Sequence, residues 1–160
     1  MRSLRHAGFA LSLLPLLSST VVARAQVPQQ QTTSMVAEAL TRVRGLAPAG
    51  ATAVGFADGL AIPDAQAATI AKAVHAERQH LRDVRVCTAR EPGACHLVGV
   101  RVFIQVNKLD VAGDTARVQV SIMDETTNSA QPVHYQQVAV TLVRTGNGWR
   151  AVGLRRLLES

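Results

Sequence analysis

Two cysteines are the residues of this chain whose chemistry depends most on their surroundings. Cys87 and Cys95 are its two cysteines, and seven residues separate them. In an oxidising compartment, such a pair in a small domain forms a disulfide. The alternative is a metal site made by both thiolates and His96, but zinc sites usually space their cysteines more closely and need a fourth ligand. We therefore predict a Cys87–Cys95 disulfide and no metal site.

The segment between the cysteines constrains this bridge. Glu91-Pro92-Gly93 is typical of a β-turn. A regular two-residue turn at this point would place Cys87 opposite Val98, too far away for a bond with Cys95. The bridge therefore requires a register centred on Glu91, and we expect residues 88–94 to form a disulfide-closed surface loop.

The candidates for acid–base chemistry are scattered along the chain. His75 and His80 lie about 140° apart around the helix expected there, so they do not share a face. His134 and Tyr135 are neighbours in an expected strand and face opposite sides. If the protein were an enzyme, its acid or base would come from Asp58, His134 or Tyr135.

Charged residues gather near the expected turns and at the C-terminus. Four acids fall at opposite ends of two paired strands, where we expect solvated turn residues rather than a pair of facing carboxylates: Asp110, Asp114, Asp124 and Glu125. The last hairpin is basic, with Glu159 as its nearby acid: Arg144, Arg150, Arg155 and Arg156. These arginines would serve an anionic ligand or a membrane surface, or they are solvated charges that discourage pairing at a sheet edge.

Residues 1–25 have the three parts of an export signal. Arg2 and Arg5 precede an uncharged apolar stretch, Ala7 to Leu17, and Ala23-Arg24-Ala25 ends it with small residues where a signal peptidase requires them. The apolar stretch is shorter than the roughly 20 residues of a membrane-spanning helix. We therefore expect cleavage between Ala25 and Gln26, no membrane span afterwards, and a secreted or periplasmic protein.

Composition argues against two other classes of function. The chain has 17 Lys and Arg against 11 Asp and Glu. Three of the arginines lie in the expected signal, which leaves 14 against 11, a net charge of +3. With three Phe, one Tyr and one Trp, few side chains are available on which bases could stack, so we expect no nucleic-acid partner. The chain has no G-x-S-x-G nucleophile motif and no cofactor-binding loop, so we expect no cofactor.

The elements that must position these residues follow from the apolar spacing. We expect a disordered tether over 26–33 and one α+β domain over 34–160. Helices are expected over 35–44, with Ser34 as N-cap, and over 65–83, with Asp64 as N-cap. Strands are expected over 52–56, 84–88, 96–108, 115–124, 133–144 and 149–157, with a polar loop over 125–132.

The last four of these strands form an antiparallel meander with one apolar face. Alternation places nine aliphatic residues on that face: Val102, Ile104, Val106, Val118, Val120, Ile122, Val138, Val140 and Leu142. Such a face needs a cover, which the helices provide. We expect Trp149, the one very large side chain, to be buried against the helical layer.

A helical region followed by a meander that ends in Gly148-Trp149-Arg150 and Val152 resembles the nuclear transport factor 2-like (cystatin-like) superfamily. The run Gly113 to Val120 is also similar to a mid-sheet strand of that family. The resemblance covers about residues 64–157. It implies a curved, cone-shaped sheet around a pocket and frequent dimers, and it implies no single activity.

These observations favour an exported, non-catalytic module that binds a small molecule or another protein through the sheet. The alternative is an enzyme of the isomerase or dehydratase kind with a pocket in the cone of the sheet. The fold also allows a second copy of the chain as a partner, in a homodimer formed through the sheet. A deep cavity with a buried ionisable group would favour the enzyme, and a filled cone would favour the binding module.

The first testable prediction concerns processing. When the full chain is expressed in a bacterium, the exported protein should begin at Gln26, because signal peptidase cuts after the small residue Ala25. Mass spectrometry of the intact exported protein and of its N-terminal peptide measures this. An exported protein that still carries Met1 would contradict the prediction.

Overall fold

The computed structural model describes residues 28–87, 95–125 and 133–159, and these residues form an α+β fold. The helices are α1 (Gln29–Arg44), α2 (Asp64–Ala73) and α3 (Leu81–Val84). The strands are β1 (Thr52–Phe56), β2 (Glu77–Arg78), β3 (Arg85–Cys87), β4 (Cys95–Leu97), β5 (Val102–Ala112), β6 (Thr115–Glu125), β7 (Val133–Thr145) and β8 (Gly148–Glu159). The export signal, its cleavage site and the Glu91-Pro92-Gly93 turn lie outside the described residues, as does most of the 125–132 loop.

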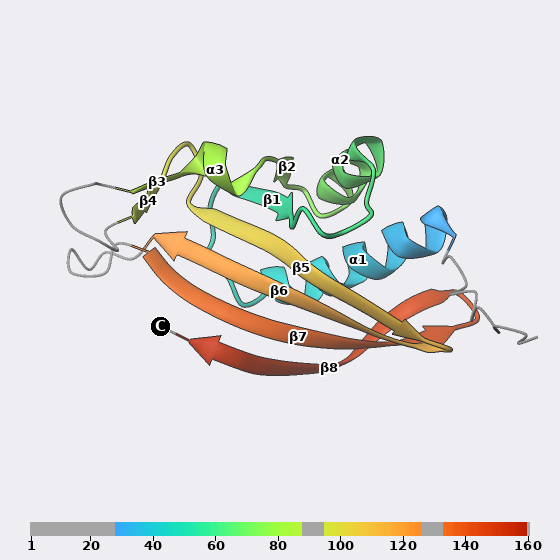
Figure 1. Cartoon of the computed structure of the whole chain (residues 1–160). Helices are drawn as coiled ribbons and strands as arrows, with labels where there is room; N and C mark the ends of the chain where they lie inside the picture. The colour runs from blue at the N-terminus through green and yellow to red at the C-terminus, as the bar shows by residue number, and fades with distance from the viewer. Residues whose placement is uncertain (1–27, 88–94, 126–132, 160) are drawn as a thin grey trace, which may run out of the picture.

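A six-stranded sheet in the order β2-β1-β5-β6-β7-β8 organises the molecule (Figure 1). Strands β5 to β8 form the expected antiparallel meander, whereas β1 pairs parallel to both β2 and β5. Strands β3 and β4 form a separate two-stranded sheet. The single strand expected over 96–108 is divided between β4 and β5. Residues 98–101 between them are not in a strand, and Gly99 interrupts the extended backbone with a positive φ of 76°.

The predicted apolar face is the centre of the core. All nine residues assigned to it are at most 2 % exposed and belong to one cluster. Helix α1 covers this face and contacts β6, β7 and β8 (Figure 1). The helix buries five side chains completely against the sheet: Met35, Val36, Ala39, Leu40 and Val43. Burying one large aliphatic side chain contributes roughly 1.5–3 kcal/mol, so this contact contributes several kcal/mol to the stability of the fold.

Trp149 is buried in the same cluster, as expected, with 8 % of its surface exposed. The Arg144 guanidinium lies over the indole, 5.1 Å from the ring centroid. Nearby, Glu38 of α1 accepts a hydrogen bond from the Ala151 backbone N–H at 3.1 Å. The beginning of β8 is therefore held to α1 by the packing of Trp149 and by the hydrogen bond of Ala151.

Helix α1 is longer than expected. It begins at Gln29, so residues 29–33, expected to be part of a disordered tether, are helical. Ser34 is not an N-cap but lies inside the helix, where its hydroxyl donates to the carbonyl of Gln31. Gln66 of α2 donates from Nε2 to the carbonyl of Gln29 and to Thr33 Oγ1, at 2.8 and 3.0 Å. This tertiary contact stabilises the first turn, which local composition alone did not predict.

The helix expected over 65–83 is wrong beyond Ala73. His75 has a left-handed backbone with φ 53°. The Ala76 N–H donates to the Ala71 carbonyl and the His75 N–H to the Lys72 carbonyl, which is the Schellman pattern that ends a helix. Arg44 of α1 donates from Nη1 to the carbonyls that follow, Val74 at 2.6 Å and His75 at 2.9 Å.

The chain after α2 turns back onto the sheet instead of continuing as helix. Asp64 is not the N-cap of α2: that position is Pro63, and no side chain caps the helix with a hydrogen bond. Asp64 instead forms an ion pair with Arg78. Residues 77–78 pair with β1, and the short α3 follows. The strand expected over 84–88 is described as β3, which starts at Arg85 because Val84 still belongs to α3.

The predicted disulfide is present. Cys87 and Cys95 are bonded, and they are direct register partners in the β3–β4 pair with Cα atoms 4.0 Å apart. Val86 lies opposite His96 in the same pair. This register is centred on position 91, as the bridge requires, and it excludes the tight turn that would have placed Cys87 opposite Val98.

The end of α2 generates a second prediction. His75→Gly should raise the free energy of unfolding by about 0.5–1 kcal/mol, because glycine adopts a positive φ without the steric cost that a Cβ imposes. Urea denaturation followed by circular dichroism measures this.

Ala73→Gly is the matched control, since Ala73 is exposed and lies in the last turn of α2. It should lower the free energy of unfolding by roughly 0.5–1 kcal/mol, because glycine weakens a helix. If both glycine variants were destabilised equally, position 75 would be helical and the described end of α2 would be wrong.

Candidate functional site

The face of the sheet opposite α1 carries a second, smaller apolar cluster. Its buried members come from β1, α3, β4, β5, β6 and the segment between β4 and β5: Ala53, Val84, Leu97, Val100, Phe103 and Met123. Gly55 is needed here, because a Cβ at that position would lie 2.5 Å from the Phe103 ring and 3.0 Å from the Gln79 carbonyl oxygen. This cluster fixes α3 and the β3–β4 pair over one part of the sheet and leaves the space beside them open.

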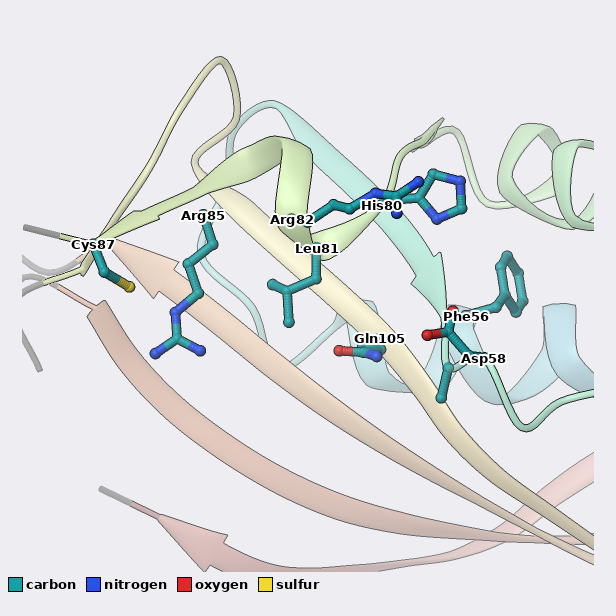
Figure 2. Close-up of a pocket in the computed structure, with 9 residues that line it drawn as sticks. Phe56, Asp58, His80, Leu81, Arg82, Arg85, Cys87 and Gln105 are labelled. Atoms are coloured by element: carbon teal, nitrogen blue, oxygen red, sulfur yellow. The ribbon is translucent and has the colours of Figure 1, made fainter.

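That space is a hollow of about 670 Å³ between α3, β3, β5 and the end of β1. We call it the α3 hollow. Its lining residues combine apolar, polar and charged side chains: Phe56, Ala57, Asp58, His80, Leu81, Arg82, Arg85, Cys87 and Gln105. In Figure 2, Leu81 and Arg85 extend from α3 and β3 toward the sheet, and Gln105 lies on β5 below them. The volume is within the range of small-molecule sites.

The β3–β4 register explains why Arg85 reaches the α3 hollow. Arg85 and Cys87 are two residues apart in a strand, so both lie on the same side of it. Leu97, the partner of Arg85 in β4, is buried in the second apolar cluster, so this side faces the sheet. The same geometry brings Arg85 Nη2 to 3.2 Å from Cys95 Sγ.

The charges around the α3 hollow are unequal. Arg82 is 3.8 Å from the Asp83 carboxylate, and both side chains are largely exposed. No acid among the described residues forms an ion pair with Arg85. Among the described residues that line the hollow, Asp58 is the one carboxylate, against the guanidinium groups of Arg82 and Arg85. The hollow therefore favours an anion beside Arg85.

A hydrogen-bonded row of polar side chains continues from Gln105 across the same face. Ser121, the β6 partner of Gln105, is only 3 % exposed. Its hydroxyl accepts from Asn107 Nδ2 at 2.6 Å and bonds with the Tyr135 hydroxyl at 2.8 Å. These contacts satisfy a buried hydroxyl, so the row stabilises the sheet and holds Tyr135 in place.

The three residues named as acid or base candidates do not come together. Asp58 lines the α3 hollow. His134 lies opposite Asp124 in the β6–β7 pair, with its Nδ1 3.4 Å from the Asp124 carboxylate. Tyr135 faces the other side of β7 and bonds with Ser121. His134 and Tyr135 therefore lie on opposite faces of the sheet, as adjacent strand residues should.

The other histidines are also apart. His75 is the left-handed residue after α2, and His80 precedes α3 and lines the α3 hollow, so neither lies on the long helix expected for them. His96 is exposed on β4. Within the described ranges, no three His, Cys, Asp or Glu side chains gather as a set of metal ligands.

The acids near the turns lie where the sequence predicted, at opposite ends of the β5–β6 hairpin. Asp110 pairs with Lys108 at 2.9 Å and Asp114 with Arg144 at 3.5 Å. Asp124 and Glu125 lie at the other end. Because the acids at one end of the hairpin are far from those at the other, the two sets cannot supply the facing carboxylates of an acid–base dyad.

The C-terminal arginines do not form one basic patch. Arg144 contacts Trp149 and Asp114. Arg155 lies opposite Ala139 in the β7–β8 pair and Arg156 opposite Val138, so these two face different sides of the sheet. Strand β8 is an edge of the six-stranded sheet and exposes Val152, Leu157 and Leu158.

Sequence reasoning missed the main lining residues of the α3 hollow, Leu81, Arg85 and Gln105. Leu81 falls inside the helix expected over 65–83, because the sequence does not predict the end of α2. The spacing of Arg85 and Cys87 in a strand was the available signal, since it places a guanidinium on the same side as a disulfide sulfur.

Comparisons with protein-family models, with curated proteins and with solved structures found no match to this chain. In the part of the chain that is described, no helix has both the length and the apolar character needed to cross a bilayer.

Proposed function

We propose that the chain is an exported, non-catalytic binding module that takes a small amphipathic anion in the α3 hollow. The observation that carries this proposal is the position of Arg85, a guanidinium without an acid partner among the described residues, in a hollow also lined by Leu81 and Gln105. A carboxylate would pair with Arg85. The apolar part of the ligand would lie against Leu81, with the Gln105 amide available for a hydrogen bond.

Export is part of the proposal and rests on two independent features. Residues 1–25 combine a basic start, an apolar stretch and small residues before Gln26. The Cys87–Cys95 bridge is typical of oxidising compartments. Together they support a secreted or periplasmic protein.

The packing of α1 supports a binding module in preference to an enzyme with a central pocket. Its five fully buried side chains occupy the apolar face of the meander, which is where a cone-shaped sheet would hold its ligand. The resemblance to the nuclear transport factor 2-like superfamily stays part of the proposal, supported by the helices before the meander and by the Gly148-Trp149-Arg150 hairpin. The isomerase or dehydratase alternative has less support, because Asp58, His134 and Tyr135 lie apart.

A homodimer through the sheet would use β8. Its exposed side chains include Val152 and Leu158, and its backbone is the edge of the sheet. Arg150 and Arg155 are also exposed on this strand. Opposed arginines would weaken those registers that place them face to face, so such a dimer requires a register that separates them.

Anion binding is tested with a pair of ligands that differ in charge. We expect 2-naphthoate to shift the backbone amide signals of residues 81–87 and 105 in ¹H–¹⁵N NMR spectra of the oxidised protein. Its neutral analogue 2-naphthamide should shift the same signals much less. Arg85→Gln should weaken naphthoate binding about tenfold, because the charge-assisted contact is lost.

Arg117→Gln is the matched control, since it removes the same charge from an exposed position at the far end of β6. It should leave the affinity unchanged. Equal shifts with naphthoate and naphthamide, or shifts confined to the β8 edge or to the α1 face, would overturn the proposed site.

A further inference from the structure

The two cysteines of the disulfide differ in their exposure to solvent. Cys87 is exposed and lines the α3 hollow, whereas Cys95 is only 4 % exposed. A thiol in solution therefore reaches Cys87 and not Cys95. In thiol–disulfide exchange the sulfur that is attacked forms the new bond, and its partner leaves as a thiolate. The leaving group here would be Cys95.

The residue beside that leaving group is a cation. Arg85 Nη2 donates to Cys95 Sγ at 3.2 Å. This contact is weak while the sulfur is bonded and neutral, and it strengthens when the sulfur becomes an anion. A neighbouring arginine stabilises a cysteine thiolate and so favours the reduced form. No acid among the described residues pairs with this guanidinium and competes for it.

We propose that Cys87–Cys95 is an exchange-active disulfide that reacts with low-molecular-weight thiols, and that Arg85 stabilises the Cys95 thiolate released by the reaction. The Arg85 guanidinium acts directly on the sulfur that leaves. The proposal does not depend on anion binding in the α3 hollow.

The exchange proceeds in two balanced steps. A thiolate attacks Cys87 Sγ, a bond forms between the two sulfurs, and the Cys87–Cys95 bond breaks with its electron pair passing to Cys95 Sγ. A second thiolate attacks the external sulfur of the mixed disulfide and releases Cys87 as a thiolate. Two thiols become one small-molecule disulfide, and the protein gains two electrons and two protons.

The fold can accommodate both states of the bridge. Strands β3 and β4 form their own two-stranded sheet, so opening the bridge breaks no hydrogen bond of the six-stranded sheet. Val84 and Leu97 on either side stay anchored to Phe103 and Met123 in the second apolar cluster. The two cysteines thus remain register partners, ready to close again.

The test is a redox titration of the folded protein at pH 7 in buffers of reduced and oxidised glutathione. Free thiols are trapped by alkylation and counted by mass spectrometry, and circular dichroism confirms that the protein stays folded. We expect the reduced form to accumulate within the range of the glutathione buffers. Arg85→Gln should lower the equilibrium constant for reduction about tenfold, because the Cys95 thiolate loses its cation.

Two further variants and one mapping experiment sharpen the result. Arg85→Lys should keep part of the effect, and Arg117→Gln should behave as the unaltered protein. Glutathione trapped as a mixed disulfide should map to Cys87. A bridge that stays oxidised until the protein unfolds, equal equilibrium constants for Arg85→Gln and Arg117→Gln, or a mixed disulfide on Cys95 would each overturn the proposal. Naphthoate binding by the oxidised protein is measured separately, so failure of one proposal leaves the other standing.

Discussion

The burial of one face of α1 against the apolar face of the β5–β8 meander is the contact on which the rest of the structure depends. A single antiparallel layer with nine buried aliphatic positions is not stable in water without a cover. Five side chains of α1 supply this cover over β6, β7 and β8 and leave none of their surface exposed, and Ile70 and Ala71 of α2 belong to the same cluster. As a consequence, side chains of α1 fill the part of this face that the helix covers. The α3 hollow lies on the other face of the sheet.

The described residues cover the other face only in part, and the α3 hollow lies in the part they leave open. Helix α3 and the β3–β4 pair are anchored through Phe103 and Met123. Beside them the α3 hollow stays open, with Arg85 and Cys87 on its wall. One strand spacing thus puts a guanidinium next to both a space for a small anion and a disulfide sulfur. The proposed binding site and the proposed exchange reaction are two consequences of the same local geometry.

Much of this fold follows from patterns that are local in the sequence. Strict alternation predicts β5 to β8 and their buried face, and the Gly146-Asn147-Gly148 turn predicts the last hairpin. The end of α2 could not be predicted in this way. No glycine or proline marks it, and residue 75 is a histidine. What ends the helix is distant in the chain: the Arg44 contacts with two carbonyls, the Arg78–Asp64 ion pair and the parallel pairing of β2 with β1. The lining of the α3 hollow depends on that break, so its residues were missed with it.

Hydrogen exchange of the native protein, resolved to single amides, tests most directly whether α1 is the permanent cover of the meander. The account predicts that the amides of residues 36–43 exchange with the same opening free energy as those at the centres of β6 and β7, because helix and sheet lose their packing together. Rapid exchange of α1 beside a protected sheet would contradict it, since the apolar face would then open to solvent and to ligands while the sheet stayed intact.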